Sequence, residues 1–261
     1  MKIVGIIPSR YNSVRFPGKA LADLDGTPMV CRVCQSALNC KLLDEIHVAT
    51  DSPEIRAVCE ERGFSVIMTG SHHENPTSRM KEVSDRIRAD RYVMIGGDEP
   101  LLTAADIGLV IGSALSAQKA AGACPETEQI YVVNAMTAIS RQEEAADPTN
   151  IKIVCGEGNL GLYASRLPIP FSGKEPSSPH RKFVSIGVYT KEALDFFAAV
   201  SPGPLELAEE CDLLRFMEHK KNILFADIKN HTHSVDTPKD LELVQRILQK
   251  RRTDEQQGTT L

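Results

Sequence analysis

The residues best suited to chemistry form a basic segment near the start of the sequence. PSRYNSVRFPGK, residues 8–19, places Arg10, Arg15 and Lys19 within ten positions, together with Gly18 and small polar residues. A triphosphate needs both positive charge and backbone N–H donors, and this segment offers both. It matches neither a Walker A motif nor a G-x-G-x-x-G fingerprint, so a solvated basic loop is the alternative interpretation.

Two aspartates stand where a metal-bound phosphate could be held. Asp98 lies in GGDEP, directly after the apolar run 92–95, and Asp236 lies in VDTP, just before the last expected helix. Either aspartate could simply be a helix cap. If the two meet at one edge of a sheet, they would instead bind Mg²⁺, which prefers oxygen ligands and bridges substrate phosphates.

The first half of the chain alternates β-branched runs with helical periodicity, which is typical of a parallel sheet covered by helices. Ser52 before Pro53 predicts a helix N-cap. Ligands of open α/β sheets bind beyond the carboxyl ends of the strands, so segment 8–19 and Asp98 are expected at one site. The expected strands are 3–8, 45–50, 65–69 and 92–95, and the expected helices are 27–38, 53–62, 77–89 and 104–119.

The second half favours shorter strands, a hairpin turn at 156–159 and a surface loop at 171–180 that could cover a site. We expect one catalytic domain, 1–250, with a nucleotide-binding half, 1–125, an acceptor-binding half with dimerisation elements, 126–250, and a flexible tail, 251–261. The expected strands are 129–139, 151–155, 161–165, 183–189 and 222–227, and the expected helices are 191–199, 204–218 and 237–250.

Composition limits the class of protein. The chain has 261 residues and a net charge of −5, which argues against a general nucleic-acid binder. The opening apolar run is too short for a signal peptide, and no stretch approaches the roughly 20 apolar residues of a membrane helix. Seven scattered cysteines suggest reduced thiols, so we expect a cytoplasmic protein without a membrane partner.

Several residues invite a metal or redox interpretation, and packing or surface roles are the simpler expectation. Cys31 and Cys34 form a C-x-x-C inside a helical run, without the second half of a zinc site. Cys211 has no histidine in a recognisable motif, so packing is expected. His231 and His233 are expected in an exposed loop, and the pair at 72–73 on the surface.

Five successive motifs resemble those of the 3-deoxy-manno-octulosonate cytidylyltransferases, the CMP-Kdo synthetases of bacterial lipopolysaccharide assembly. They are PSRYNSVRFPGKAL, MIGGDEP, YASRLPIPF, SIGVYTKEAL and SVDTPKDLE, and the resemblance runs from residue 1 to about residue 245. It implies a Rossmann-like, GT-A-like α/β fold: a three-layer sandwich with a mostly parallel central sheet and a small β-rich extension. It also implies a homodimeric, Mg²⁺-dependent enzyme that transfers CMP from CTP to a 2-keto-3-deoxy sugar acid and releases pyrophosphate.

The resemblance assigns residues to roles in the same order. Those expected to bind the nucleotide are Pro8, Ser9, Arg10, Arg15, Lys19, Thr77, Arg79 and Asp98. Those expected to act in catalysis are Arg10, Lys19, Asp98 and Asp236, of which Asp98 and Asp236 also hold the metal. Those expected around the acceptor are Gly96, Arg166, Ser185, Tyr189, Glu206, Glu209 and Asp212.

The sequence departs from the family pattern mainly on the acceptor side. The family glutamine before GDEP is Gly96, the histidine of HLGIY is Ser185, and EQLR reads DLLR at 212–215. A pocket built to hydrogen-bond a polyol loses strongly when its donors vanish, which suggests a changed acceptor. Alternatives are another nonulosonic acid, an amino-sugar acid or a phosphonate, and, from another class, a non-catalytic nucleotide-binding protein.

Overall fold

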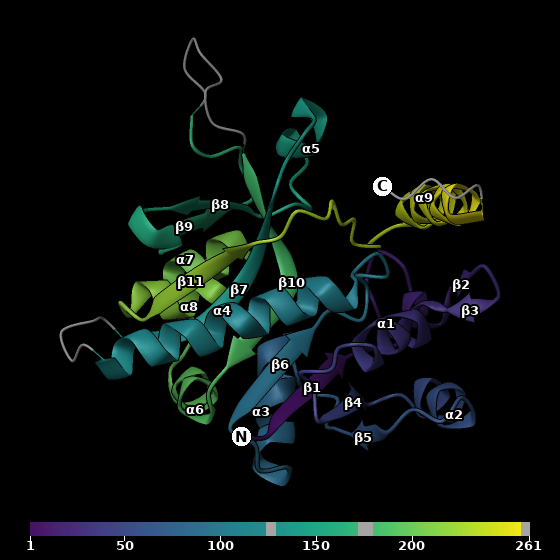
Figure 1. Cartoon of the computed structure of the whole chain (residues 1–261), viewed down its shortest axis with the longest axis horizontal. Helices are drawn as coiled ribbons and strands as arrows, with labels where there is room; N and C mark the ends of the chain where they lie inside the picture. Colours follow the sequence, from purple (N-terminus) through teal and green to yellow (C-terminus); the bar gives the residue numbers. More distant parts are fainter. Residues whose placement is uncertain (124–128, 172–179, 257–261) are drawn as a thin grey trace.

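The computed structural model describes residues 1–123, 129–171 and 180–256, and it shows one central sheet with helices on both faces (Figure 1). β1 runs parallel to β4 and β6, β4 to β5, and β7 to β11, whereas β10 is antiparallel between β6 and β7. The mostly parallel α/β sheet expected from the sequence is therefore confirmed. The order along the sheet is β11 (Asn222–Asp227), β7 (Ile130–Ala138), β10 (Arg181–Tyr189), β6 (Arg91–Ile95), β1 (Ile3–Pro8), β4 (Glu45–Thr50) and β5 (Val66–Met68).

Two hydrophobic cores, one on each face of the sheet, make the molecule three-layered. Each helix buries an apolar stripe against the strands, as amphipathic helices of α/β proteins do. The helix that begins at Pro53 is capped by the Ser52 side chain, whose hydroxyl accepts from the Ile55 N–H at 3.1 Å. This N-cap was expected from the sequence. The first core includes α1 (Met29–Leu38), α2 (Pro53–Glu61) and α4 (Ala104–Ala123), and the second includes α3 (Pro76–Arg86), α6 (Lys191–Ala199) and α8 (Leu213–Glu218).

A small antiparallel hairpin extends the sheet beside β10. β8 (Lys152–Cys155) pairs with β9 (Gly161–Ser165) and with the start of β10. Gly158 in the connecting turn has a φ of 65°, which a glycine adopts without strain. The expected β-rich extension and its turn at 156–159 are confirmed, whereas residues 172–179 of the expected loop lie outside the described residues.

Several expected helices end differently from the prediction. α3 ends at Arg86 instead of 89, and α4 ends at Ala123 instead of 119. The single helix expected over 204–218 is wrong: α7 (Pro204–Glu209) stops at Glu210, whose φ is 47°, and α8 follows. The break turns the chain back so that Arg215 forms a bidentate ion pair with the buried Glu206, at 2.6 and 2.7 Å. No glycine or proline marks this turn in the sequence. The final helix, α9 (Pro238–Gln256), also continues six residues past the expected end at 250, and Arg251 in this extension donates to the Leu101 carbonyl at 3.4 Å and to Asn230 Oδ1 at 2.9 Å.

Shorter elements were not expected from the sequence. Residues 19–21 form a 3-10 turn, and β2 (Asp23–Leu24) pairs with β3 (Thr27–Pro28) before α1 begins. A five-residue helix, α5 (Gln142–Ala146), follows β7. Segments this short carry too little periodicity to be recognised.

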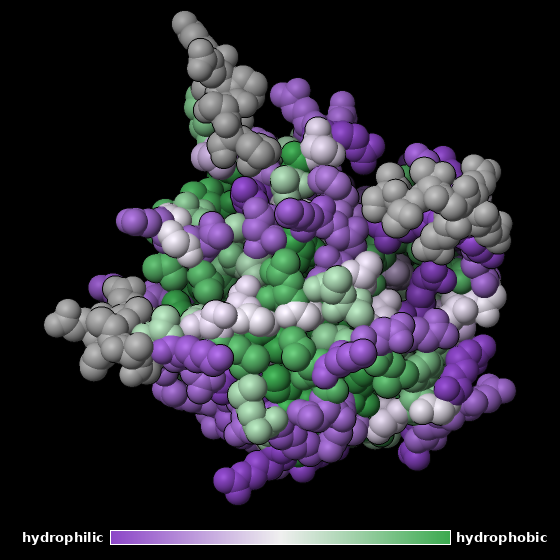
Figure 2. Space-filling view, in the orientation of Figure 1, coloured by the Kyte–Doolittle hydropathy of each residue, from purple (hydrophilic) through white to green (hydrophobic). Residues whose placement is uncertain are grey.

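The cysteines and the surface agree with a packed, globular chain. Cys31, Cys34 and Cys211 are buried, as expected for packing residues. Hydrophilic residues border the face shown in Figure 2, and hydrophobic residues gather near its middle. Among the described residues, none of the helices has the combination of length and apolar character that crossing a bilayer requires.

Candidate active site

The basic segment and Asp98 start from neighbouring strands at the same edge of the sheet. β1 ends at Pro8 and β6 ends at Ile95, and these two strands pair in parallel. Gly97 lets the two following segments approach, because a Cβ there would overlap the Ser9 hydroxyl and lie 3.0 Å from the Pro8 carbonyl oxygen. The chain reversal after β1 uses Gly18, whose φ is 73°.

A cavity of about 870 Å³ opens beyond this edge. Its size is within the range of small-molecule sites. Of the expected site residues, those that line it are Pro8, Ser9, Arg10, Arg15, Lys19, Arg79, Gly96, Asp98, Arg166, Ser185, Glu206, Asp212 and Asp236. Three of the expected residues do not line it, namely Thr77, Tyr189 and Glu209.

Lys19 joins the two aspartates at the cavity wall. Its Nζ donates to Asp98 Oδ2 at 2.7 Å, to Asp236 Oδ1 at 2.9 Å and to the Val235 carbonyl at 2.9 Å. Arg15 adds a second cation to Asp236 Oδ1 at 2.9 Å. Segments that are more than 200 residues apart in the sequence therefore meet at one charged cluster.

The charge balance of this cluster favours an ionised lysine. The Lys19 side chain is only 13% exposed, and burial by itself lowers the pKa of an ammonium group. The carboxylates of Asp98 and Asp236 act in the opposite direction and outweigh burial, so the pKa of Lys19 is raised above 10.5. Lys19 is thus a fixed positive charge at neutral pH.

Neither aspartate caps a helix with its side chain. Asp240 accepts from the Thr237 N–H at 2.8 Å, and the Thr237 hydroxyl accepts from the Asp240 N–H, so this pair caps α9. Thr103 and Asp106 cap α4 in the same way. The capping alternative is therefore wrong for Asp236 and for Asp98, whose carboxylates face Lys19 instead.

Arg79, on the cavity wall formed by α3, has an acidic partner that the sequence did not indicate. Arg79 is 4% exposed and lies 3.2 Å from Asp51 Oδ1, with a further hydrogen bond to Thr69 Oγ1 at 2.5 Å. Asp51 follows β4 directly, and Asp98 comes three residues after the end of β6. Its place at a strand end is the signal that could have identified it.

Thr77 and Tyr189 lie behind the cavity wall, because their side chains point into the second core. The Thr77 hydroxyl donates to Asp212 Oδ2 at 2.6 Å, and Asp212 itself reaches the cavity. Burial raises the pKa of Asp212, although the bond from Thr77 opposes this shift. The ring of Tyr189, which is fully buried, packs against Phe216 at a centroid distance of 6.2 Å. The expectation that Tyr189 contacts the acceptor is therefore wrong. Tyr189 supports the wall of the cavity instead.

The Arg166 guanidinium donates its hydrogen bonds to backbone carbonyls. Nε donates to the Glu209 carbonyl at 2.8 Å, Nη1 to the Pro148 carbonyl at 2.8 Å and Nη2 to the Glu210 carbonyl at 3.2 Å. The Glu209 carboxylate in turn accepts from the Arg166 backbone N–H at 2.8 Å, so Glu209 positions Arg166 and stays outside the cavity. Lys152, which is fully buried, also donates to the Arg166 carbonyl.

Gly96 and Ser185 face each other beside Asp98. The Gly96 N–H donates to the Ser185 carbonyl at 2.7 Å. A Cβ at position 96 would lie 2.6 Å from the Ser185 Cβ and 3.0 Å from Asp98 Oδ1. A larger residue at 96 would therefore force β6 and β10 apart, so this part of the cavity wall is built for glycine.

Comparison with known proteins identifies the family of the chain. The family model described as Cytidylyltransferase matches residues 4–223. The chain belongs to this family. Its resemblance to the 3-deoxy-manno-octulosonate cytidylyltransferases is also confirmed, since a protein of that name from Escherichia coli is 32% identical over 95% of this chain and 96% of its own length. The corresponding protein from Geotalea daltonii is 36% identical over 96% of this chain and 100% of its own length.

Solved structures extend the comparison to the fold. The structure of a CMP:2-keto-3-deoxy-manno-octonic acid synthetase complexed with CTP superposes with a TM-score of 0.84 and 32% identity, covering 96% of this chain and 100% of that one. A glucose-1-phosphate thymidylyltransferase from Bacillus anthracis reaches a TM-score of 0.67 at 14% identity, covering 94% of each chain. The second likeness shows the fold alone. The expected nucleotidyltransferase fold is confirmed.

Proposed function

We propose that this chain transfers CMP from CTP to 3-deoxy-manno-octulosonate or a closely related 2-keto-3-deoxy sugar acid and releases pyrophosphate. The observation that carries the proposal is the contact of Lys19 with both Asp98 and Asp236 at the cavity wall. It supports the proposal because it brings a cation and two carboxylates together beyond the carboxyl ends of β1 and β6. Relatives that share nearly the whole chain have the same activity in their names.

The chemistry needs one bond to form and one to break. An acceptor hydroxyl oxygen attacks the α-phosphorus of CTP, the bond from that phosphorus to the bridging oxygen breaks, and pyrophosphate leaves while the hydroxyl proton passes to solvent. Transfers of this kind are catalysed mainly by positioning and by stabilising charge. Arg10, Arg15 and Lys19 would neutralise the negative charge that grows on the leaving oxygens.

Asp98 and Asp236 would hold Mg²⁺ in this reaction. Their carboxylates already converge on one cationic group, the Lys19 ammonium, and oxygen donors of this kind are the ones Mg²⁺ prefers. When bound, Mg²⁺ supplies positive charge at the α-phosphate and lowers the pKa of the attacking hydroxyl. Lys19 would then keep the carboxylates oriented and contact the phosphates.

A different acidic acceptor is a second candidate, because Gly96 and Ser185 stand where the family has larger polar residues. Gly96 leaves no room for a side chain beside Ser185, so the donors expected for a polyol are replaced by a hydroxyl and backbone. The alternatives are another nonulosonic acid, an amino-sugar acid or a phosphonate. They keep the nucleotide chemistry and change only the nucleophile.

A panel of acceptors tests both candidates in one assay. Pyrophosphate release is measured with CTP, Mg²⁺ and each acid in turn. The proposal predicts release with 3-deoxy-manno-octulosonate or with one acid of the panel. UTP in place of CTP is the nucleotide control. CTP binding without pyrophosphate release for any acid would instead favour the non-catalytic nucleotide-binding alternative.

The proposal includes a cytoplasmic homodimer, as the resemblance implies. Hydrophobic residues gather on the face that α4 crosses (Figures 1 and 2), and Leu109 of α4 is 42% exposed. Such a face is typical of a surface that a partner covers. Sedimentation equilibrium of the purified chain tests the dimer, and a monomer at micromolar concentration would contradict it.

A further inference from the structure

Two histidines and a glutamate converge at the rim of the cavity, outside the aspartate site. His72, His73 and Glu82 each place one ligand atom within 4.8 Å of the other two. The histidines lie between β5 and α3, and Glu82 lies within α3. The surface location expected for the pair holds for His72 but is wrong for His73, whose side chain is 6% exposed.

The atoms around this cluster hold two of its members in place. His73 contacts Glu82 Oε2 through Nε2 and Ser78 Oγ through Nδ1, the latter at 3.2 Å. Metal-binding histidines usually carry such a hydrogen bond on the ring nitrogen that does not bind the ion. Glu82 also accepts from the Gly70 N–H at 2.9 Å and pairs with Arg86.

His72 is the member that an ordinary His–Glu pair does not explain. Within the described part of the chain its ring makes no hydrogen bond, yet it lies against the His73 ring at a centroid distance of 4.2 Å. Gly70 makes this position possible, because a Cβ there would overlap the ring atoms of His72. Rotation of this exposed ring about its side-chain torsions is the movement that would bring its nitrogen to roughly 2.0–2.2 Å from an ion shared with the other two ligands.

We propose that His72, His73 and Glu82 form a second metal site, which takes a divalent transition-metal ion of the zinc class. Two imidazoles and one carboxylate form a ligand set that binds Zn²⁺ with one position left for water, whereas the all-oxygen set of Asp98 and Asp236 suits Mg²⁺. The ion inserts between His73 Nε2 and Glu82 Oε2, the two atoms of this direct contact. Because His73 lines the cavity, the bound ion fixes this part of its rim.

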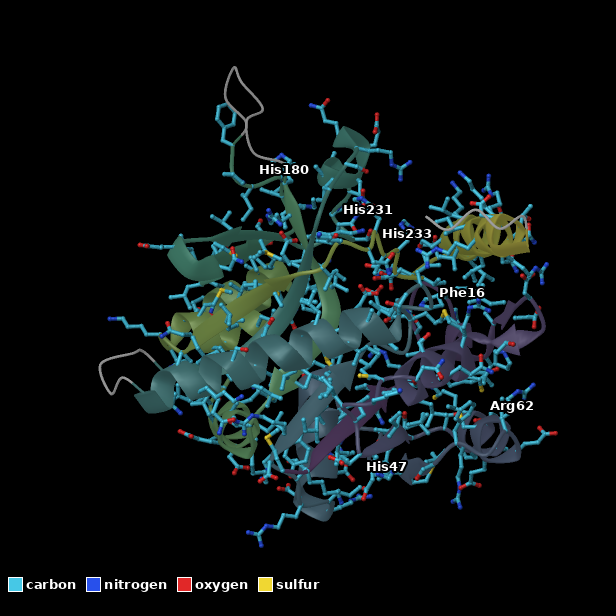
Figure 3. All side chains as sticks on the ribbon, viewed as in Figure 1. Phe16, His47, Arg62, His180, His231 and His233 are labelled. Atoms are coloured by element: carbon cyan, nitrogen blue, oxygen red, sulfur yellow. The ribbon has the colours of Figure 1, made fainter. Side chains whose placement is uncertain are left out.

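Metal binding by the full-length chain tests the site without reference to activity. Zn²⁺ is titrated calorimetrically in the presence of excess Mg²⁺, which occupies the aspartates. His72→Ala removes one exposed ligand, and Gly70→Ala keeps every ligand but displaces the His72 ring; Gly70 has no positive φ to prevent that change. His231→Ala is the matched control, since His231 is exposed on the segment between β11 and α9 (Figure 3).

The expected result is one Zn²⁺ per chain for the wild type and for His231→Ala. Both His72→Ala and Gly70→Ala should bind at least about tenfold more weakly, as expected when a ligand is lost or misplaced. Circular dichroism confirms that each variant is folded. The proposal is overturned if the wild type takes up no stoichiometric Zn²⁺, or if His72→Ala binds as tightly as His231→Ala.

Discussion

Replacing Lys19 by methionine removes a charge while keeping most of the side-chain volume. The Lys19 ammonium makes three hydrogen bonds, to Asp98, to Asp236 and to the Val235 carbonyl. Hydrogen bonds to charged groups are worth about 1.5–3 kcal/mol, and partial exposure of both carboxylates reduces the total here. The loss in the free energy of unfolding should therefore be smaller than the roughly 5–15 kcal/mol by which a typical domain is stable, so we expect the variant to fold at 25 °C.

The folded Lys19→Met variant should also lose most of its turnover. A preorganised group that stabilises charge in the transition state contributes about 2.7–4 kcal/mol, which corresponds to a loss of roughly 10² to 10³ in kcat. Continuous pyrophosphate detection with saturating CTP and Mg²⁺ gives kcat, and urea denaturation gives the free energy of unfolding. Lys41→Met, at an exposed position, is the control.

Two outcomes would contradict a catalytic role of Lys19. A kcat for Lys19→Met within about threefold of the wild type would mean that Lys19 only ties the aspartates together. A variant that is unfolded at 25 °C would show that the cluster is chiefly structural.

Three further predictions concern buried groups in and behind the cavity wall. Thr77→Val leaves the buried Asp212 carboxyl without its 2.6 Å donor and should lower the free energy of unfolding by about 1–3 kcal/mol in urea, whereas Ser113→Ala on α4 should change it little. Arg215→Met leaves Glu206 buried and unpaired and should cost about 3–5 kcal/mol, most of which Glu206→Leu in the same chain should restore; a double variant as unstable as the single one would contradict this. Burial raises the pKa of Glu99 from 4.5 to about 7, so the folded state holds its proton more tightly and wild-type stability falls as pH rises from 4.5 towards 7. Glu99→Gln should remove up to about 3 kcal/mol of that fall, and thermal melts between pH values of about 4.5 and 8 that match the wild type would count against it.

The elements and the meeting of Lys19 with Asp98 were predictable because both depend on strand periodicity. Runs of β-branched residues identify β1 and β6, and parallel neighbours bring their carboxyl ends to one edge. Asp236 was predictable only through the family motif, since Thr237 and Asp240 give the same local pattern with a capping role.

The remaining site features depend on contacts between distant residues. The break at Glu210 follows from the pair of Arg215 with Glu206, and no residue in between signals it. Arg166 could not be recognised as a backbone-binding residue, because its partners at 148, 209 and 210 are carbonyls of two other segments. The sequence identifies the chemical groups that are present, whereas tertiary packing determines which of them are in contact.

Manganese binding measured by electron paramagnetic resonance, with and without CTP, tests the central proposal most directly. Mn²⁺ takes the same oxygen ligands as Mg²⁺ and reports its own bound fraction. We expect that wild-type protein with CTP binds Mn²⁺ and that Asp98→Asn and Asp236→Asn each weaken this binding at least about tenfold, while the folded state is kept. Mn²⁺ binding in the CTP complex that is unchanged in both variants would contradict the assignment of these aspartates to the metal.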